Sequence, residues 1–160
     1  MQALNDQVVI VGIGEYHVGR TAMSSIGLGS CIGLVIHDPE RDIGGLAHVM
    51  LPDSQGRTDR PAKYADTAVG LLVGEIGRQG SKPGALVAKI VGGASMFQSF
   101  SGNLNIGDRN IEAVKLQLKR SNIRIAAEET GGVQGRTIVY YPSDKGKISV
   151  KTADGTVRFI

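Results

Sequence analysis

Residues 27–52 read GLGSCIGLVIHDPERDIGGLAHVMLP, in which two short apolar runs flank a polar cluster. Such a pattern is typical of a β-hairpin. The proline in the cluster pre-sets φ for the second position of a type I turn, and the preceding Asp38 suits the first position. If the turn starts at Asp38 and ends at Arg41, Cys31 and His48 lie directly opposite each other on one face of the hairpin. Their Cβ atoms would then be roughly 4.5–5.5 Å apart.

A thiol and an imidazole at that separation can share a proton, as the nucleophile and base of a cysteine hydrolase must. A protonated His48 would also lower the pKa of Cys31, the single cysteine of the chain. The alternative is that Cys31 is a buried apolar residue, because free cysteine is among the most buried residue types. A one-residue slip in the turn would place the two side chains on opposite faces. The hairpin therefore predicts chemistry at Cys31 and His48 that depends on its register.

The other two histidines are weaker candidates for chemistry. His37 lies six residues from Cys31 on the same strand face, about 20 Å away at ~3.3 Å per residue. We expect it to cap the turn in solvent. His17 lies in a segment that reads as a loop. The three histidines have no ligand spacing that indicates a metal site, so no metal is expected.

Six ordered motifs run along the chain: Leu28-Gly-Ser-Cys31, Ala47-His-Val-Met-Leu-Pro52, Lys63-Tyr-Ala-Asp66, Gly92-Gly-Ala-Ser-Met-Phe97, Asn105-Ile-Gly-x-Arg-Asn110 and Thr130-Gly-Gly132. Together they resemble the CheD-type chemoreceptor glutamine deamidases, from about residue 8 to residue 151. The resemblance implies a cysteine hydrolase that converts glutamine side chains of methyl-accepting chemotaxis receptors to glutamate through a thioester, releasing ammonia. It implies that Cys31 is the nucleophile and His48 the base.

The resemblance also implies a third catalytic residue. The family commonly has a threonine six residues before the nucleophile, where its hydroxyl orients the histidine. Ser25 occupies that position here, and it keeps the hydroxyl but lacks the methyl that stiffens threonine at χ1. Ser24 is expected to face the other way on an extended strand. The backbone N–H groups of Ser30 and Cys31 are the candidates for holding a developing oxyanion, in a lead-in rich in glycine.

Partners follow from the same resemblance. They are the helical cytoplasmic domain of the receptors and a CheC-type phosphatase that acts on the response regulator CheY. A second function stays open, in which the chain is a regulatory binding module that docks both. A glutamate methyl ester has the same acyl geometry as glutamine and an easier leaving group, so methylesterase activity is chemically accessible. The loop at residues 53–60 and the segment 92–97 are where we expect receptor contacts. Phe97 is either an exposed apolar anchor there or a core residue.

Composition agrees with these expectations. A chain of 160 residues predicts one domain, residues 1–160, with room for a core. One cysteine allows no internal disulfide and suits a reducing compartment. No stretch approaches the ~20 apolar residues of a membrane span, and the start has no basic n-region of a signal peptide. We therefore expect a cytoplasmic protein that does not insert into membranes.

Nucleic acid and cofactors are not expected partners. The chain has no tryptophan, 4% aromatic residues and a net charge of +3, which argues against a surface that stacks on bases and indicates an ordinary solvated surface. The pair Gly12-Ile-Gly14 lacks the third glycine of a dinucleotide fingerprint, because His17 occupies its position. Gly92-Gly-Ala94 is expected to let the backbone approach the active site or a neighbouring strand.

The fold class predicted from the pattern of elements is α+β. About seven to eight strands and two helices do not make a regular βαβ array, and the resemblance implies stacked mixed or antiparallel β-sheets with about two helices packed outside. One helix is expected at about residues 61–78, capped by Asp59, and another at about residues 109–119, capped by Asp108. Three glycines in the first helix suggest close packing against a sheet. The strands are expected at residues 8–13, 20–26, 32–36, 86–91, 123–127, 136–141 and 147–151, and the second arm of the hairpin is expected to begin at residue 43.

Overall fold

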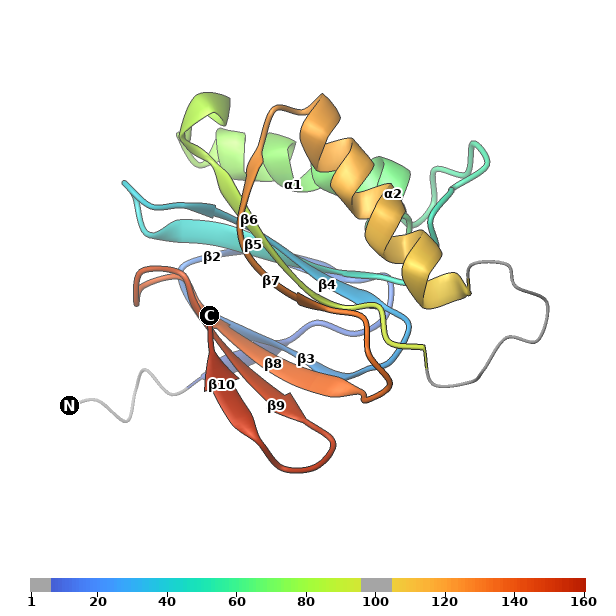
Figure 1. The fold of residues 1–160 in the computed structure, drawn as a ribbon. Coiled ribbons are helices and arrows are strands. Elements are labelled where there is room, and N and C mark those ends of the chain that lie inside the picture. The colour runs from blue at the N-terminus through green and yellow to red at the C-terminus, as the bar shows by residue number, and fades with distance from the viewer. Residues whose placement is uncertain (1–6, 96–104) are drawn as a thin grey trace.

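The computed structural model describes residues 7–95 and 105–160. Within them, ten strands form two stacked five-stranded mixed sheets, and two α-helices cover the outer face of one sheet (Figure 1). The predicted α+β class, with stacked sheets and two helices packed outside, is confirmed.

The sheet under the helices has the strand order β2-β5-β4-β6-β7, and the other sheet has the order β1-β3-β8-β9-β10. The elements are β1 (Val8–Ile10), β2 (Tyr16–Gly19), β3 (Ala22–Leu28), β4 (Ile32–Asp38), β5 (Ile43–Val49), η2 (Pro61–Lys63), α1 (Ala65–Arg78), η3 (Pro83–Ala85), β6 (Val87–Gly92), α2 (Ile106–Arg120), β7 (Arg124–Thr130), β8 (Arg136–Tyr141), β9 (Lys147–Thr152) and β10 (Val157–Phe159). The strands β2 and β10 were not expected from the sequence. Both are short, lie at an edge of their sheet and bury little of their side chains. Such strands lack the apolar pattern by which a strand is predicted from sequence.

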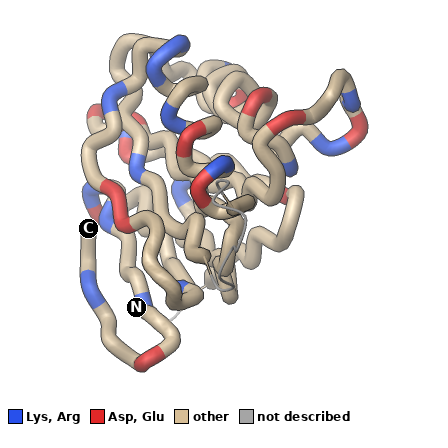
Figure 2. The backbone as a smooth tube through the Cα atoms, turned by 45° about the vertical axis from the view of Figure 1, so that its right-hand side comes forward, with Lys and Arg blue, Asp and Glu red and all other residues tan. Residues whose placement is uncertain are grey.

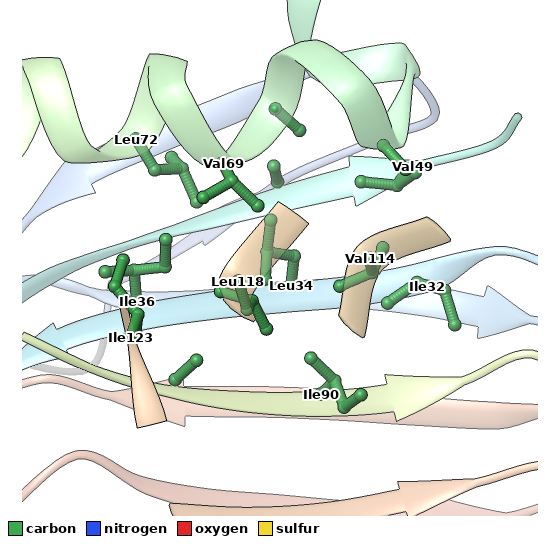
Figure 3. Packing of buried hydrophobic residues seen from close by; sticks show 14 of the residues in the cluster. Ile32, Leu34, Ile36, Val49, Val69, Leu72, Ile90, Val114, Leu118 and Ile123 are labelled. Carbon is green, nitrogen blue, oxygen red and sulfur yellow. The ribbon is translucent and has the colours of Figure 1, made fainter. Parts of the chain in front are cut away.

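Strand β4 lies at the centre of the three layers, and all seven of its residues are buried. Ile32, Leu34 and Ile36 point toward α1 and α2, where they pack against residues such as Val69 and Val114 (Figure 3). The alternate residues of β4 face the other sheet instead. A strand that is covered on both faces needs an almost continuous apolar run, which is the pattern that the sequence has here.

The β4–β5 hairpin forms as predicted, but its register differs. Asp38 pairs with Ile43, so the connection holds four residues, and His48 pairs with Gly33 rather than with Cys31. Within the turn, the Asp38 carboxylate accepts hydrogen bonds from the backbone N–H groups of Glu40 and Arg41. Asp42 has a left-handed φ of 54°. A left-handed aspartate is uncommon. With Asp42 in this conformation the connection is two residues longer than that of the predicted Asp38–Arg41 turn.

Both helices begin differently from the prediction. The short 3₁₀ turn η2 precedes α1, and between them Tyr64 is extended and forms a β-bridge with Leu51. Asp59 therefore does not cap α1, whose N-cap residue is Tyr64. Helix α2 begins at Ile106, and its cap is Asn105, whose Oδ1 accepts from the N–H of Asp108.

The three glycines of α1 do not pack closely. Apart from the chain neighbours and the nearby helix backbone, no described atom lies within 4 Å of a Cβ built at Gly70, Gly74 or Gly77. These glycines are exposed, so the expectation of close packing against a sheet is wrong. The residues of α1 that contact the sheet are the apolar stripe Ala65, Ala68, Val69, Leu72 and Ile76.

Charges of both signs are interspersed along the backbone, as Figure 2 shows. That distribution is typical of an ordinary solvated surface. Among the described residues, no helix is long and apolar enough to cross a membrane.

Candidate active site

Cys31 lies in the bend just before β4. Its side chain is partly buried and packs against the core between the two sheets. The backbone around it is held by the segment that follows β6, because the Cys31 carbonyl accepts from Gly93 N at 2.9 Å and the Gly29 carbonyl accepts from Ala94 N at 2.9 Å. The expected close backbone approach of Gly92-Gly-Ala94 is therefore confirmed.

That approach requires glycine at residue 92. Gly92 has a φ of 117°, which side chains rarely adopt. A Cβ at this position would collide with the carbonyl oxygen of Cys31. The glycine thus lets two strand ends meet beside the thiol.

His48 is buried on β5, and its ring points between the sheets. Its Nδ1 lies 3.2 Å from the carbonyl oxygen of Val11. Because a carbonyl oxygen can only accept, Nδ1 carries the proton, and in the neutral ring Nε2 keeps its lone pair. Nε2 is buried and has no hydrogen-bond partner within residues 7–95 and 105–160. The ring is therefore held in the tautomer that a general base needs.

Cys31 and His48 share a face of the hairpin but do not lie directly opposite each other. Since His48 pairs with Gly33, the thiol is its diagonal neighbour, and Cβ atoms in that relation are typically about 7–8 Å apart or somewhat less. The predicted direct opposition is wrong because the turn is longer than expected. The two-residue change keeps both side chains on the same face, since side chains alternate with a period of two.

Ser25 reaches the same carbonyl as His48. Its side chain is fully buried, and its hydroxyl donates to the carbonyl oxygen of Val11 at 2.8 Å. Val11 also donates its own N–H to the carbonyl of Ser24 at 2.7 Å. The serine and the histidine are thus linked through one backbone oxygen, a contact that no sequence motif reveals. The side chain of Ser24 points elsewhere, as expected, and donates to the Ile138 carbonyl.

Burial sets the ionisation of the site. Burial raises the pKa of the Cys31 thiol. Burial also lowers the pKa of His48, although the Val11 hydrogen bond and the nearby Glu15 carboxylate act in the opposite direction. Near neutral pH the pair is therefore a thiol and a neutral imidazole. The expected lowering of the thiol pKa is wrong, because the thiol is partly buried and His48 Nε2 makes no hydrogen bond to it.

The other two histidines have different surroundings. His37 is 3% exposed, and its Nδ1 lies 2.6 Å from the hydroxyl of Tyr140. The expectation that it caps the turn in solvent is wrong, because its face of β4 meets the other sheet, where Tyr140 supplies a polar partner. His17 lies on β2 rather than in a loop. Among the described residues, no group of three His, Cys, Asp or Glu side chains is placed to hold a metal ion.

The loop at residues 53–60 is expected to contact the receptor, and side chains near both of its ends are hydrogen-bonded to other parts of the chain. In the loop at residues 53–60, Ser54 donates from its N–H and its hydroxyl to the carboxylate of Asp66. Arg60 donates to the Ile13 carbonyl, next to the segment that carries Val11. Phe97 lies outside the described residues.

The chain matches the family model "CheD chemotactic sensory transduction" over residues 50–152. The chemoreceptor glutamine deamidase CheD of Thermotoga maritima is 49% identical over 148 residues, which are 91% of this chain and 92% of the relative. The probable chemoreceptor glutamine deamidase CheD of Archaeoglobus fulgidus is 46% identical over 149 residues, which are 92% of this chain and 94% of the relative. The chain belongs to the CheD family.

Membership of the CheD family extends over the hairpin with the thiol. The family-model match begins at residue 50 and so leaves out Cys31 and His48. The Thermotoga relative leaves only about 9% of the chain unmatched. That remainder is too short to exclude residues 31–48 from either end, so the stretch that matches the Thermotoga relative spans both positions.

Proposed function

We propose that this protein hydrolyses selected glutamine side chains of methyl-accepting chemotaxis receptors to glutamate. The observation that carries the proposal is the Val11 hydrogen bond to His48, which leaves an unprotonated Nε2 on the hairpin face that also carries the single cysteine. The names of the relatives indicate the substrate class. The site residues proposed are Cys31, His48 and Ser25.

The chemistry begins with proton transfer from the Cys31 thiol to Nε2 of His48. The sulfur attacks the glutamine Cδ, and the carbonyl π electrons move onto oxygen to give a tetrahedral oxyanion. The N–H groups of Ser30 and Cys31 are proposed to stabilise that oxyanion, since neither has an acceptor among the described backbone and side-chain contacts. The C–N bond then breaks as His48 returns the proton to nitrogen, so ammonia leaves and a glutamyl thioester remains.

Hydrolysis of the thioester completes the cycle. His48 takes a proton from water, whose oxygen attacks the thioester carbonyl, and the C–S bond breaks. The sulfur regains the proton, and the product is a glutamate side chain. Ser25 is proposed to act indirectly, by donating to Val11 and fixing the carbonyl that orients the imidazole.

The decisive experiment measures ammonia release from a cytoplasmic receptor fragment, with mass spectrometry to locate the converted glutamines. The wild-type protein should release ammonia, and Cys31→Ala should release none while keeping the wild-type melting temperature. Cys31→Ala loses a small, partly buried side chain, so a folding defect is not expected. Activity in Cys31→Ala would refute the thiol mechanism, and no activity in the wild type would refute the proposed reaction.

Four further assignments belong to this proposal. A receptor glutamate methyl ester presents the same acyl carbon, so methanol release from methylated fragments tests for methylesterase activity. Binding of a CheC-type phosphatase by the Cys31→Ala variant, without turnover, tests the regulatory alternative. Because the proposed substrate is the cytoplasmic part of the receptors, we propose that the protein acts in the cytoplasm. We also propose that residues 1–160 act as one catalytic domain, because both sheets contribute to the site.

A further inference from the structure

Asn110 joins the segment of the nucleophile to the segment of the base. It lies on α2, and it is fully buried. Its Nδ2 donates to the carbonyl of Ser30 at 2.9 Å and to the carbonyl of Met50 at 2.9 Å. Ser30 precedes Cys31, and Met50 follows His48 by two residues. One amide group from the helical layer thus holds both catalytic segments.

The carbonyl groups of three consecutive residues at the nucleophile are all bound from the protein interior. Those of Gly29 and Cys31 accept from Ala94 N and Gly93 N, and that of Ser30 accepts from Asn110. In a planar trans peptide the N–H of the next residue points opposite to the carbonyl. The N–H groups of Ser30 and Cys31 are therefore turned away from these donors and have no acceptor of their own among the described contacts.

The side chain of Asn110 is not fully satisfied by this arrangement. Its Oδ1 is buried and has no hydrogen-bond partner within residues 7–95 and 105–160. A buried amide oxygen without a partner is unfavourable for folding. A residue selected for stability alone would be expected to satisfy both ends of its amide, whereas here the two donors alone are used, and both are directed at the catalytic segments.

We propose that Asn110 is a positioning residue of the reaction. By holding the Ser30 carbonyl it fixes the plane of the Ser30–Cys31 peptide, and so aims the Cys31 N–H at the oxyanion that forms when the sulfur attacks. This inference rests on the proposed acyl chemistry at Cys31 and extends it to a residue far away in the sequence. It implies that Asn110 matters for the transition state and much less for substrate binding.

The test compares two reactions of the same thiol. Acylation of Cys31 by p-nitrophenyl acetate passes through a tetrahedral oxyanion, whereas alkylation by iodoacetamide is a direct displacement at carbon that forms none. Asn110→Asp, which keeps the shape but loses the donors, and Asn110→Ala should slow acylation about 10- to 100-fold, somewhat less than loss of a direct oxyanion donor. Alkylation should change less than about threefold. On a receptor fragment, kcat should fall by a similar factor to acylation while KM changes little.

Val114→Ala is the matched control, because Val114 is buried one turn further along α2 and belongs to the apolar core cluster under the helices. All rates are taken below the lowest melting temperature in the set and expressed per native thiol. An unchanged ratio of acylation to alkylation in both Asn110 variants would overturn the inference, as would a change equal to that of Val114→Ala. The ratio does not depend on receptor deamidation, so wild-type protein that acylates but releases no ammonia would refute the proposed function alone.

Discussion

At the scale of single residues, the site depends on a backbone oxygen as much as on side chains. The Val11 carbonyl accepts from both His48 and Ser25, and this arrangement fixes the tautomer of the imidazole. An uncharged acceptor stabilises an imidazolium less than a carboxylate does. Burial lowers the pKa of His48, and the hydrogen bond to Val11 offsets that effect only in part.

We predict that Ser25→Ala lowers kcat about three- to tenfold and leaves KM nearly unchanged. The variant loses one hydrogen bond to Val11, which is worth roughly 1 kcal/mol, but the bond from His48 remains. Ser24→Ala removes a neighbouring buried hydroxyl that bonds the Ile138 carbonyl instead, so it is the matched control. Steady-state ammonia release measures both variants. Equal kcat values for the two would show that the link through Val11 does not support catalysis.

At the scale of elements, glycines of the same chain have opposite roles. Gly92 is required by its φ of 117° and by the carbonyl of Cys31 against it. Gly74 sits in a regular helix with open space around it. Glycine there only adds conformational freedom to the unfolded chain.

We predict that Gly74→Ala raises the free energy of unfolding by about 0.5–1 kcal/mol, because alanine is the better helix former and meets no neighbour. Gly92→Ala should lower it by more than about 1 kcal/mol, since its φ and the contact with Cys31 both exclude a side chain. Urea unfolding measures both. A destabilised Gly74→Ala protein would mean that this face of α1 is covered by another molecule or segment.

The hairpin shows how far the sequence predicts elements. The two apolar runs around a turn predicted both arms. The shared face of Cys31 and His48 was also predicted, because it depends only on the period of two of side chains along a strand. The register was missed because it depends on the left-handed Asp42, which no local pattern announces. The burial of His37 was missed for a similar reason, since its partner Tyr140 is 103 residues away.

At the scale of the whole molecule, the candidate site takes a contribution from each of the three layers. Ser25 comes from the outer sheet, Cys31 and His48 come from the ends of the central-sheet strands, and Asn110 comes from the helices. The site therefore exists only when the layers are stacked. Stability and activity should be lost together.

We predict that the protein loses stability as the pH falls from about 7 to 5. Burial lowers the pKa of both His48 and His37 in the folded state, so the unfolded chain binds more protons in this range. The contribution of the neutral histidines to the free energy of unfolding is complete above the usual histidine pKa of about 6.5. Below that pH, protonation of each histidine can lower the free energy of unfolding by up to about 1.4 kcal/mol per pH unit.

Urea unfolding at several pH values tests this prediction in wild type, His37→Gln and His48→Gln. Each variant should show a shallower dependence between pH 6.5 and 5 than the wild type. Carboxylates whose pKa is lowered, such as those of Asp38 and Glu129, act in the same direction, but only nearer their usual values of about 4. A wild-type curve that is flat above pH 5 would contradict the assignment of buried neutral histidines.

The double burial of β4 has a consequence for motion. Its neighbours β5 and β6 occupy both of its edges, and apolar side chains cover both of its faces. Amide protons in such a strand exchange with solvent deuterium only when the whole domain opens, because no smaller fluctuation exposes them. We therefore expect the β4 amides to be among the slowest to exchange, and the proposed nucleophile Cys31 directly precedes that strand. A receptor helix would then have to adapt its own geometry to a rigidly held thiol.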